Sequence, residues 1–363
     1  MPRRTLQLQF PRLGLVRRFG LHTEGRQTEY GSPWAWNVRL EDSLTNRLRG
    51  GSFAGIAAGI RPSSVVYRDR TLTFSGAAVT ASRVGDSDDT TLSADVSDMS
   101  RPALFQFAEA GDTGEDVVAL VPHKDQYLLG FAATETWVQQ GDPLSGPRRR
   151  VSDQVGIIGA DAWCVAHDTV YFLSSRGLYS VGADGSGLKP VSEDKLPEDL
   201  IGVSDTTATL TYQHSDRGVY IHTTGDDWFY DIARDQFWPF DTEETDSHLL
   251  IGPLKLGGAD GLGLIQTLHG ITASDSATVN WRIVPGETAE EAAANGKLAI
   301  VAALAGNSYA SYVRGSGSWS AGRSSTVRPR VAAMWACLWL SSASDWAYEG
   351  VTMSVIPAGE WRK

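Results

Sequence analysis

Short apolar segments separated by turn-forming residues make up most of the sequence. The clearest example begins at Val117, where the apolar segment Tyr127–Phe131 is followed by Thr134–Val138 before Gly141-Asp142-Pro143 ends the pair. Segments of this length, bounded by Gly, Pro, Asp and Lys, predict antiparallel strands joined by tight turns. The pattern therefore indicates sheets built from consecutive strands.

The next stretch of the chain repeats this order. Ala162–Val165, Val170–Leu173 and Leu178–Val181 are three apolar segments, with turn residues at His167-Asp168-Thr169 and at 174–177. Strand, turn, strand, turn, strand is the order in which a propeller blade is built. The two successive stretches predict two blades.

A loose repeat extends this pattern along the chain. A turn aspartate followed by an aromatic or aliphatic strand recurs at Asp69, Asp125, Asp168, Asp216 and Asp260. The separations are 56, 43, 48 and 44 residues, and blade repeats run at ~40–50 residues. We therefore predict an all-β protein, a β-propeller of about six blades over residues 61–363, closed by the C-terminal strands. Residues 1–60 are predicted to form an extended N-terminal arm.

Two further features refine the prediction. Residues 286–306 are rich in alanine, which favours a short helix. Cys164 and Cys337 both lie within apolar segments, so we expect two buried thiols that contribute to packing.

The charge is unevenly distributed along the chain. The formal net charge is −11, but residues 1–50 carry nine arginines and four acids, while the remaining 313 residues carry 23 basic and 39 acidic side chains. The arm is thus basic and the body acidic, which favours docking of the arm on an acidic neighbour, with a solvated leader as the alternative. The candidate assembly residues in the arm are Trp34, Trp36, Arg39, Arg47 and Arg49.

No targeting or membrane segment is evident. The alternation after Met1 is unlike a secretory signal, and the longest apolar run, residues 331–340, is about half the ~20 residues that a spanning helix needs. We expect a protein made in the cytoplasm without an export signal.

Motifs for catalysis and for metal or cofactor binding are not found. The seven histidines do not fall at zinc-ligand spacing, and the acidic loop from Asp86 has Thr91 and Ser97 where a calcium loop needs Gly and Glu. Phosphate-binding loops and a serine-nucleophile motif are also missing. We therefore expect no metal, no cofactor and no enzymatic activity, although a pair of carboxylates of the glycosidase type remains an alternative.

The central stretch resembles the propeller core of the tail-nozzle, or DNA-stabilisation, proteins of short-tailed bacteriophages. The residues that carry this resemblance are Tyr127–Phe131, Glu135-Thr136-Trp137, Gly141-Asp142-Pro143, Val155–Gly159, Asp161–Trp163 and Val170–Ser174. Residues 37–52 and 346–359 are similar to the two ends of phage-encoded virion proteins of this type.

The resemblance implies a structural protein of the virion tail. Its implied partners are other copies of the chain in a ring, with a hexamer favoured, neighbouring tail or adaptor proteins, and double-stranded DNA that passes during ejection without specific binding. A hub or fibre-attachment protein is a variant of this hypothesis. The rival hypothesis is a tail propeller that binds or hydrolyses host glycan.

A channel for DNA would need a lining that does not bind phosphate. Acidic side chains repel DNA at short range, so we expect the surplus acids to face the lumen. The candidate channel-facing residues are Asp86, Asp88, Asp89, Glu243 and Glu244. The alternative is that these acids keep an outer surface soluble.

Overall fold

The fold described here is a computed structural model. It describes residues 64–363 except 194, 197–198, 226, 241–245, 259–260, 321–325 and 361–363, and before residue 64 the backbone of six short strands. The chain forms two compact units: residues 1–55 together with 226–363 form the first, and residues 56–225 form the second. This division differs from the expected boundary at residue 60, because the chain leaves the first unit and later returns to it.

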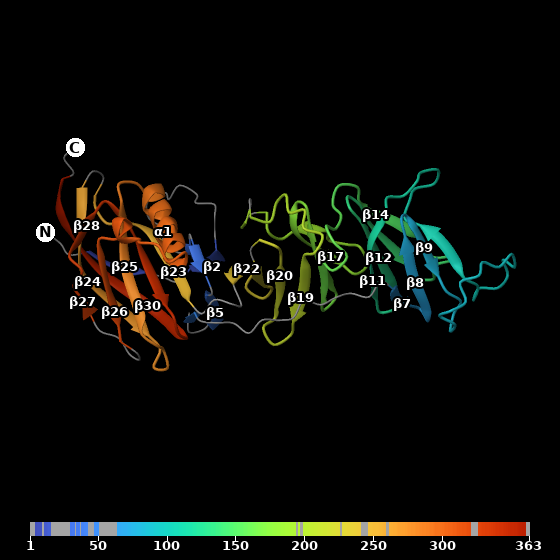
Figure 1. Cartoon of the computed structure of the whole chain (residues 1–363), viewed down its shortest axis with the longest axis horizontal. Coiled ribbons are helices and arrows are strands. Elements are labelled where there is room, and N and C mark those ends of the chain that lie inside the picture. The colour runs from blue at the N-terminus through green and yellow to red at the C-terminus, as the bar shows by residue number, and fades with distance from the viewer. Residues whose placement is uncertain are drawn as a thin grey trace. The chain divides into compact units, whose positions relative to one another are not determined.

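The second unit contains three antiparallel sheets of four strands each, in which consecutive strands pair (Figure 1). The first sheet is β7 (Ser64–Tyr67), β8 (Arg70–Ser75), β9 (Ala78–Ala81) and β10 (Ala103–Gln106). The second is β11 (Val117–His123), β12 (Tyr127–Ala132), β13 (Thr136–Gln140) and β14 (Arg148–Ser152). The third is β15 (Trp163–Ala166), β16 (Thr169–Ser174), β17 (Gly177–Gly182) and β18 (Lys189–Pro190).

Two more hairpins follow in the chain. The second unit ends with β19 (Thr209–Gln213) and β20 (Gly218–His222), and the first unit resumes with β21 (Asp227–Asp231) and β22 (Gln236–Phe240). The strands predicted over 127–181 are thus present, each within two residues of its expected ends. The all-β fold class is confirmed.

Backbone conformation at the turns explains why these strands pair with their neighbours. Arg68 and Asp69 form the whole loop between β7 and β8, and both have positive φ, 53° and 55°. Lys124 and Asp125, in the loop between β11 and β12, also have positive φ. Aspartate and asparagine tolerate this region better than most residues do, and turns of this kind match the twist of a hairpin. Asp69 and Asp125 therefore act through backbone geometry, whereas in the turns at Asp168 and Asp216 the positive φ falls on the neighbouring residues His167 and Arg217.

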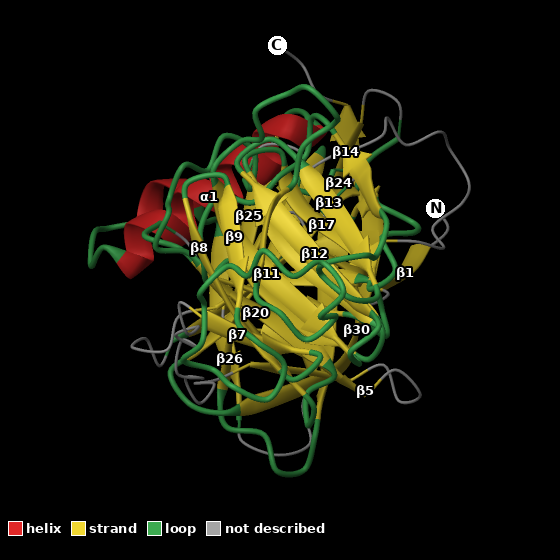
Figure 2. Ribbon diagram, turned by 90° about the vertical axis from the view of Figure 1, so that its right-hand side faces the viewer, coloured by secondary structure: helices red, strands yellow, loops and turns green. Residues whose placement is uncertain are grey.

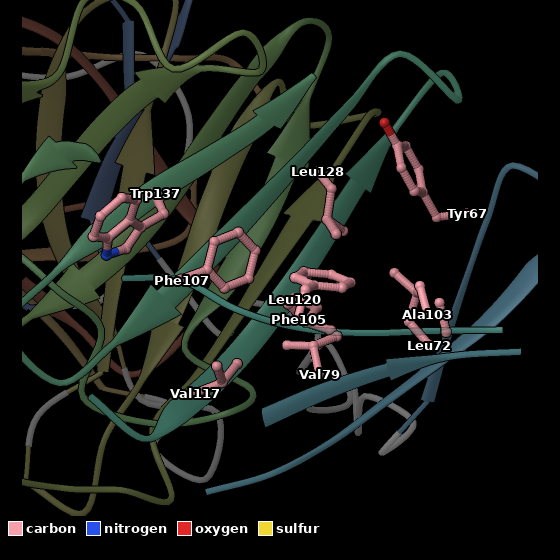
Figure 3. Close-up of a cluster of buried hydrophobic side chains, with 11 residues drawn as sticks. Tyr67, Leu72, Val79, Ala103, Phe105, Phe107, Val117, Leu120, Leu128 and Trp137 are labelled. Atoms are coloured by element: carbon pink, nitrogen blue, oxygen red, sulfur yellow. The ribbon is translucent and has the colours of Figure 1, made fainter. Parts of the chain in front are cut away.

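A hydrophobic core lies between the first and second sheets. Leu72, Val79 and Phe105 from the first sheet meet Leu120 and Leu128 from the second, and all five are buried (Figure 3). Side chains alternate between the two faces of a strand, so this core uses one face of the first sheet. Phe107 and Trp137 extend the core, with ring centroids 6.5 Å apart.

Besides β21 and β22, the first unit contains two larger sheets and a parallel pair. One sheet contains β1 (Arg4–Leu8), β5 (Val38–Asp42), β6 (Arg47–Gly50), β24 (Gly261–Thr272), β27 (Thr326–Val327), β28 (Val331–Ala333) and β30 (Trp346–Glu360). The other has the order β26 (Gly315–Trp319), β25 (Val279–Gly286), β29 (Trp335–Ser342), β23 (Ser247–Lys255) and β4 (Trp34–Trp36). The parallel pair is β2 (Pro11–Leu15) and β3 (Tyr30–Ser32).

Strands from both ends of the chain meet in the first of these sheets. β30 pairs with β1, from Arg4 opposite Val355 to Leu8 opposite Val351, and with β6 at Trp346 opposite Gly50. Three strands of the predicted arm, β1, β4 and β6, therefore pair with the body of their own unit.

Helix α1 (Ala289–Leu304) confirms the expected alanine-rich helix. Thr288 caps it by accepting a hydrogen bond from the backbone N–H of Glu291 at 3.1 Å. Its buried face, which includes Ala299 and Ile300, packs on Leu250 and Val284 of the sheet.

Strands make up most of the described chain, and α1 is its one α-helix (Figure 2). Cys164 and Cys337 are both buried thiols, as predicted.

Candidate functional site

Polar contacts join corresponding turns of successive sheets in the second unit. The backbone N–H of Arg68 donates to Asp125 Oδ1 at 2.9 Å, and the Arg68 guanidinium donates to the Asp125 carbonyl at 3.1 Å. One sheet further along, Lys124 and His123 contact the carboxylate of Asp168, and the Lys124 contact lowers the pKa of Asp168. Each of these aspartates thus binds donors from the preceding turn.

The turn at Gly141-Asp142-Pro143 is anchored to the first sheet. Tyr67 Oη donates to the Gly141 carbonyl at 2.8 Å, and Arg70 Nε lies 3.5 Å from the Asp142 carboxylate. Burial raises the pKa of Tyr67 to about 12, so its hydroxyl remains a donor at neutral pH. The turn Gly141-Asp142-Pro143, which is part of the sequence resemblance, therefore holds the first and second sheets together.

Arg70 is a fully buried cation that also holds the acidic loop. Its guanidinium donates to the carbonyls of Ser82, Met99 and Arg101 at 2.8, 2.8 and 2.7 Å. These bonds satisfy backbone acceptors on both sides of the loop between β9 and β10. The loop is therefore attached at its two ends by one side chain.

The acidic loop is structured internally by ion pairs. Arg83 contacts the carboxylates of Asp89 at 2.7 Å and Asp98 at 2.6 Å. Hydrogen bonds from Ser100 and Arg83 lower the pKa of Asp98 to about 2, and the bond from Arg83 lowers that of Asp89. Asp86 instead accepts the backbone N–H groups of two residues that follow it.

Of the predicted channel-facing acids, only some carry a charge that no ion pair offsets. Asp86 and Asp88 are exposed, whereas the charge of Asp89 is offset by Arg83. The structure brings these three aspartates together in one loop. Glu243 and Glu244 lie outside the described residues.

One face of the first sheet is accessible to solvent. Thr73 and Thr80 lie in one cross-strand row with Leu104 of β10, and Val66 lies on the same face of β7. Val66 is 67% exposed and Leu104 is 56% exposed. We call Val66, Thr73, Thr80 and Leu104 the open face.

More exposed apolar side chains lie in the neighbouring acidic loop. Leu92, Val96 and Met99 are all more than half exposed. Large apolar groups gathered on one part of a surface indicate a contact region.

The predicted arm residues lie on strands of the first unit. Trp34 is opposite Leu250 and Trp36 is opposite His248, because β4 pairs with β23. Arg39 and Arg47 lie on the β5–β6 hairpin, and Arg49 is opposite Ala347. Their backbones are thus held by sheet pairing within the chain.

A polar hollow of about 670 Å³ lies in the first unit beside η1 (Ala310–Tyr312). Asn280 and Arg282 of β25 form part of its lining, together with Tyr309, Arg314 and the edge strand β26. Arg282 donates to Ser341 Oγ at 2.8 Å and to Tyr309 Oη at 3.1 Å. Its guanidinium carbon lies 4.2 Å from the centroid of the Trp339 ring.

Near Arg282, His248 is kept neutral. Burial, together with the positive charge of Arg282, lowers the pKa of His248 to about 4. Trp339 Nε1 donates to His248 Nδ1 at 3.2 Å. His248 is therefore uncharged at neutral pH and adds no second positive charge beside Arg282.

Within the described residues, no group of three or more His, Cys, Asp or Glu side chains is arranged to hold a metal ion. No helix in the described part of the chain is long and apolar enough to cross a membrane.

No family model and no curated protein matches the chain. Among solved structures, the extracellular domain of a hybrid two-component system from B. thetaiotaomicron is 12% identical over 61% of this chain, with a TM-score of 0.34. The match covers 27% of that structure's own chain. The AfRom2 CNH domain is 9% identical over 52% of this chain and 62% of its own, with a TM-score of 0.28.

A glycoside hydrolase family 43 arabinoxylan arabinofuranohydrolase from Bacillus subtilis is 8% identical over 86% of this chain and 65% of its own. Its TM-score is 0.22. These likenesses are too distant to carry an argument about function.

Sequence reasoning placed the acidic loop but missed the hollow. The segment Val279–Val284 alternates buried residues with Asn280 and Arg282, which was a signal of a polar face on one side of a strand. No local pattern linked this strand to Tyr309 or Ser316, because these residues meet only through tertiary packing.

Proposed function

We propose that this chain is a non-enzymatic structural protein of a short-tailed phage virion, acting as a tail nozzle or hub component. In this proposal its four-stranded sheets are blades of a propeller of about six blades. The chain assembles as a ring of identical copies, with a hexamer favoured, beside neighbouring tail or adaptor proteins. The proposal combines the sequence resemblance with the surface features of the second unit.

The open face is the observation that carries the proposal. In a stacked arrangement of sheets, each inner sheet buries both faces, but here the first sheet buries one face and exposes the other. Valine, threonine and leucine on that face suit packing against another sheet. Burying the remaining exposed surface of Val66, and likewise of Leu104, would contribute about 1–2 kcal/mol at each position, which favours a partner surface there.

The acidic loop fits a role in a DNA channel. Five aspartates and two arginines lie in residues 83–101, so the loop keeps a negative charge after its ion pairs form. In the ring, we propose that Asp86, Asp88 and Asp89 face the lumen, where the charges of Asp86 and Asp88 centre the duplex by repulsion. Electron microscopy of the assembled ring would test this, and a loop on the outer wall would refute it.

The assembly proposal is tested by measuring the mass of the full chain in solution. We expect light scattering to give a mass several times 39.2 kDa. The double substitution Val66→Asp and Leu104→Asp should shift the protein toward monomer, because it places charges on the open face. Leu298→Asp and Val301→Asp, at exposed apolar positions on α1, are the matched control and should leave assembly intact. A wild-type chain that is monomeric at all concentrations would contradict the proposal.

A further inference from the structure

The hollow beside Arg282 has a floor made of cross-strand rows on the helix side of the sheet. One row is Ser318, Asn280, Ser341 and His248, and the next is Ser316, Arg282, Trp339 and Leu250. Helix α1 packs over the second row at Leu250 and Trp339. The part of the sheet toward β26 forms the hollow of about 670 Å³, a volume within the range of small-ligand sites.

The charge in this hollow is positive and not neutralised nearby. Arg282 is half-buried, and Arg314 is exposed at the rim. No carboxylate among the described residues forms an ion pair with either arginine. Hydrogen bonds to Ser341 and Tyr309 and stacking on Trp339 fix the guanidinium of Arg282 in position. A guanidinium has five N–H donors, so donors remain for an anionic ligand.

Strand β26, at the edge of the sheet, forms one wall of the hollow, and its small glycine and serine residues make this wall low and polar. Gly315 and Gly317 alternate with Ser316 and Ser318, and a Cβ on Gly317 would lie 2.6 Å from the Trp281 ring. The glycines are therefore required on the side facing the core, while the serines line the hollow. Together with the Asn280 amide, they offer small hydrogen-bonding groups at short spacing.

We propose that this hollow binds an acidic sugar residue of a glycan, with the sugar carboxylate on Arg282 and Arg314. The hydroxyl groups of the sugar are bound by Asn280, Ser316 and Ser318. Arginine recognises carboxylate through paired hydrogen bonds, and amide and hydroxyl side chains suit a ligand with many hydroxyls. The site lies within the first unit and does not depend on the proposed role in the virion.

An acidic sugar suits the hollow better than an acidic peptide. Of the lining side chains, Val313 and Ala310 are small apolar groups, so the site offers little to a large peptide side chain. The hydroxyl and amide groups instead give several polar contacts beside one cationic centre.

The test is titration of the full chain with glucuronic acid and N-acetylneuraminic acid, followed by calorimetry or ligand-observed NMR. We expect at least one acidic sugar to bind, and Arg282→Gln to weaken its binding roughly 10-fold to 100-fold, as expected for loss of charge-assisted hydrogen bonds. Arg328→Gln removes an exposed arginine outside the hollow and should leave binding unchanged. Ser316→Trp fills the hollow without removing either arginine, so we expect it to abolish binding as well.

Several outcomes would overturn the proposal. These are absence of binding by both acidic sugars, equal binding of glucose, equal binding of acetate or inorganic phosphate, and tighter binding of a tetraglutamate peptide. Unchanged affinity in both Arg282→Gln and Ser316→Trp would also overturn it.

Discussion

Arg70 must stay paired inside the second unit because its charge is fully buried. It donates to four backbone carbonyls and lies 3.5 Å from Asp142. Arg70→Met would leave those carbonyls and the carboxylate without their donor. We expect it to lower the free energy of unfolding by about 3–5 kcal/mol, measured by urea denaturation. Arg70→Lys keeps the charge and should lose less; equal stability of wild type and Arg70→Met would refute this account.

His248 gives the first unit a specific sensitivity to acid. Its pKa is lowered to about 4 in the folded chain, below the ordinary value of 6.5, so the unfolded chain binds more protons between these values. Stability is therefore fully present above pH 6.5 and falls as the pH drops toward 4, by roughly 3 kcal/mol. His248→Asn keeps an acceptor for the Trp339 indole, and denaturation at pH 7 and pH 4 should show a smaller loss in this variant. A loss equal to that of wild type would exclude His248 as the cause.

At the scale of elements, helix α1 approaches the sheet through a glycine. A Cβ on Gly296 would lie 2.5 Å from Leu250 Cδ2, and Leu250 is fully buried. Gly296→Ala gains about 1 kcal/mol of helix propensity, but overpacking a core costs about 1–3 kcal/mol. We expect a net loss of stability near 1 kcal/mol in chemical denaturation.

The matched control for this helix is the double variant Gly296→Ala with Leu250→Val, which shortens the opposing side chain. In the Leu250→Val background, Gly296→Ala should lower the free energy of unfolding less than it does in the wild-type chain. A Gly296→Ala protein that is more stable than wild type would show that propensity outweighs the close contact.

In the second unit, the turn aspartates contribute both to the hairpins and to the contacts between sheets. Positive φ at Asp69 and Asp125 sets the hairpins, and the Asp125 and Asp168 side chains then bind the preceding turn. The same residue type therefore serves local folding and packing between sheets. This double use explains why a repeat in the sequence matched a repeat of sheets.

At the scale of the whole molecule, the two ends of the chain are part of one unit. β1 and β6 pair with β30, and β4 pairs with β23. Removing residues 1–50 would leave these strands with unpaired edges, which promote aggregation. Deletion of the arm is therefore a poor test of its role in assembly, and substitutions on the open face separate assembly from folding more cleanly.

The sequence by itself determined the local features of this protein. Alternating apolar segments and turn residues predicted most strands between 127 and 182, alanine content predicted α1, and apolar surroundings predicted the buried thiols of Cys164 and Cys337. These features depend on neighbouring residues, because strand periodicity, turn φ angles and helix propensity are local properties. The position of the acidic loop was determined in the same way.

Tertiary structure alone decided which distant segments meet. The pairing of Arg4 with Val355, the bonds from Arg70 to the acidic loop, and the meeting of Arg282 with Tyr309 at one hollow have no local signature. Sheet pairing and the burial of charge depend on the register and packing of residues far apart in the chain. For this reason the candidate acids were found in the sequence while the ion pairs that neutralise Asp89 were not, and the arginine hollow came into view only when its strands were brought together.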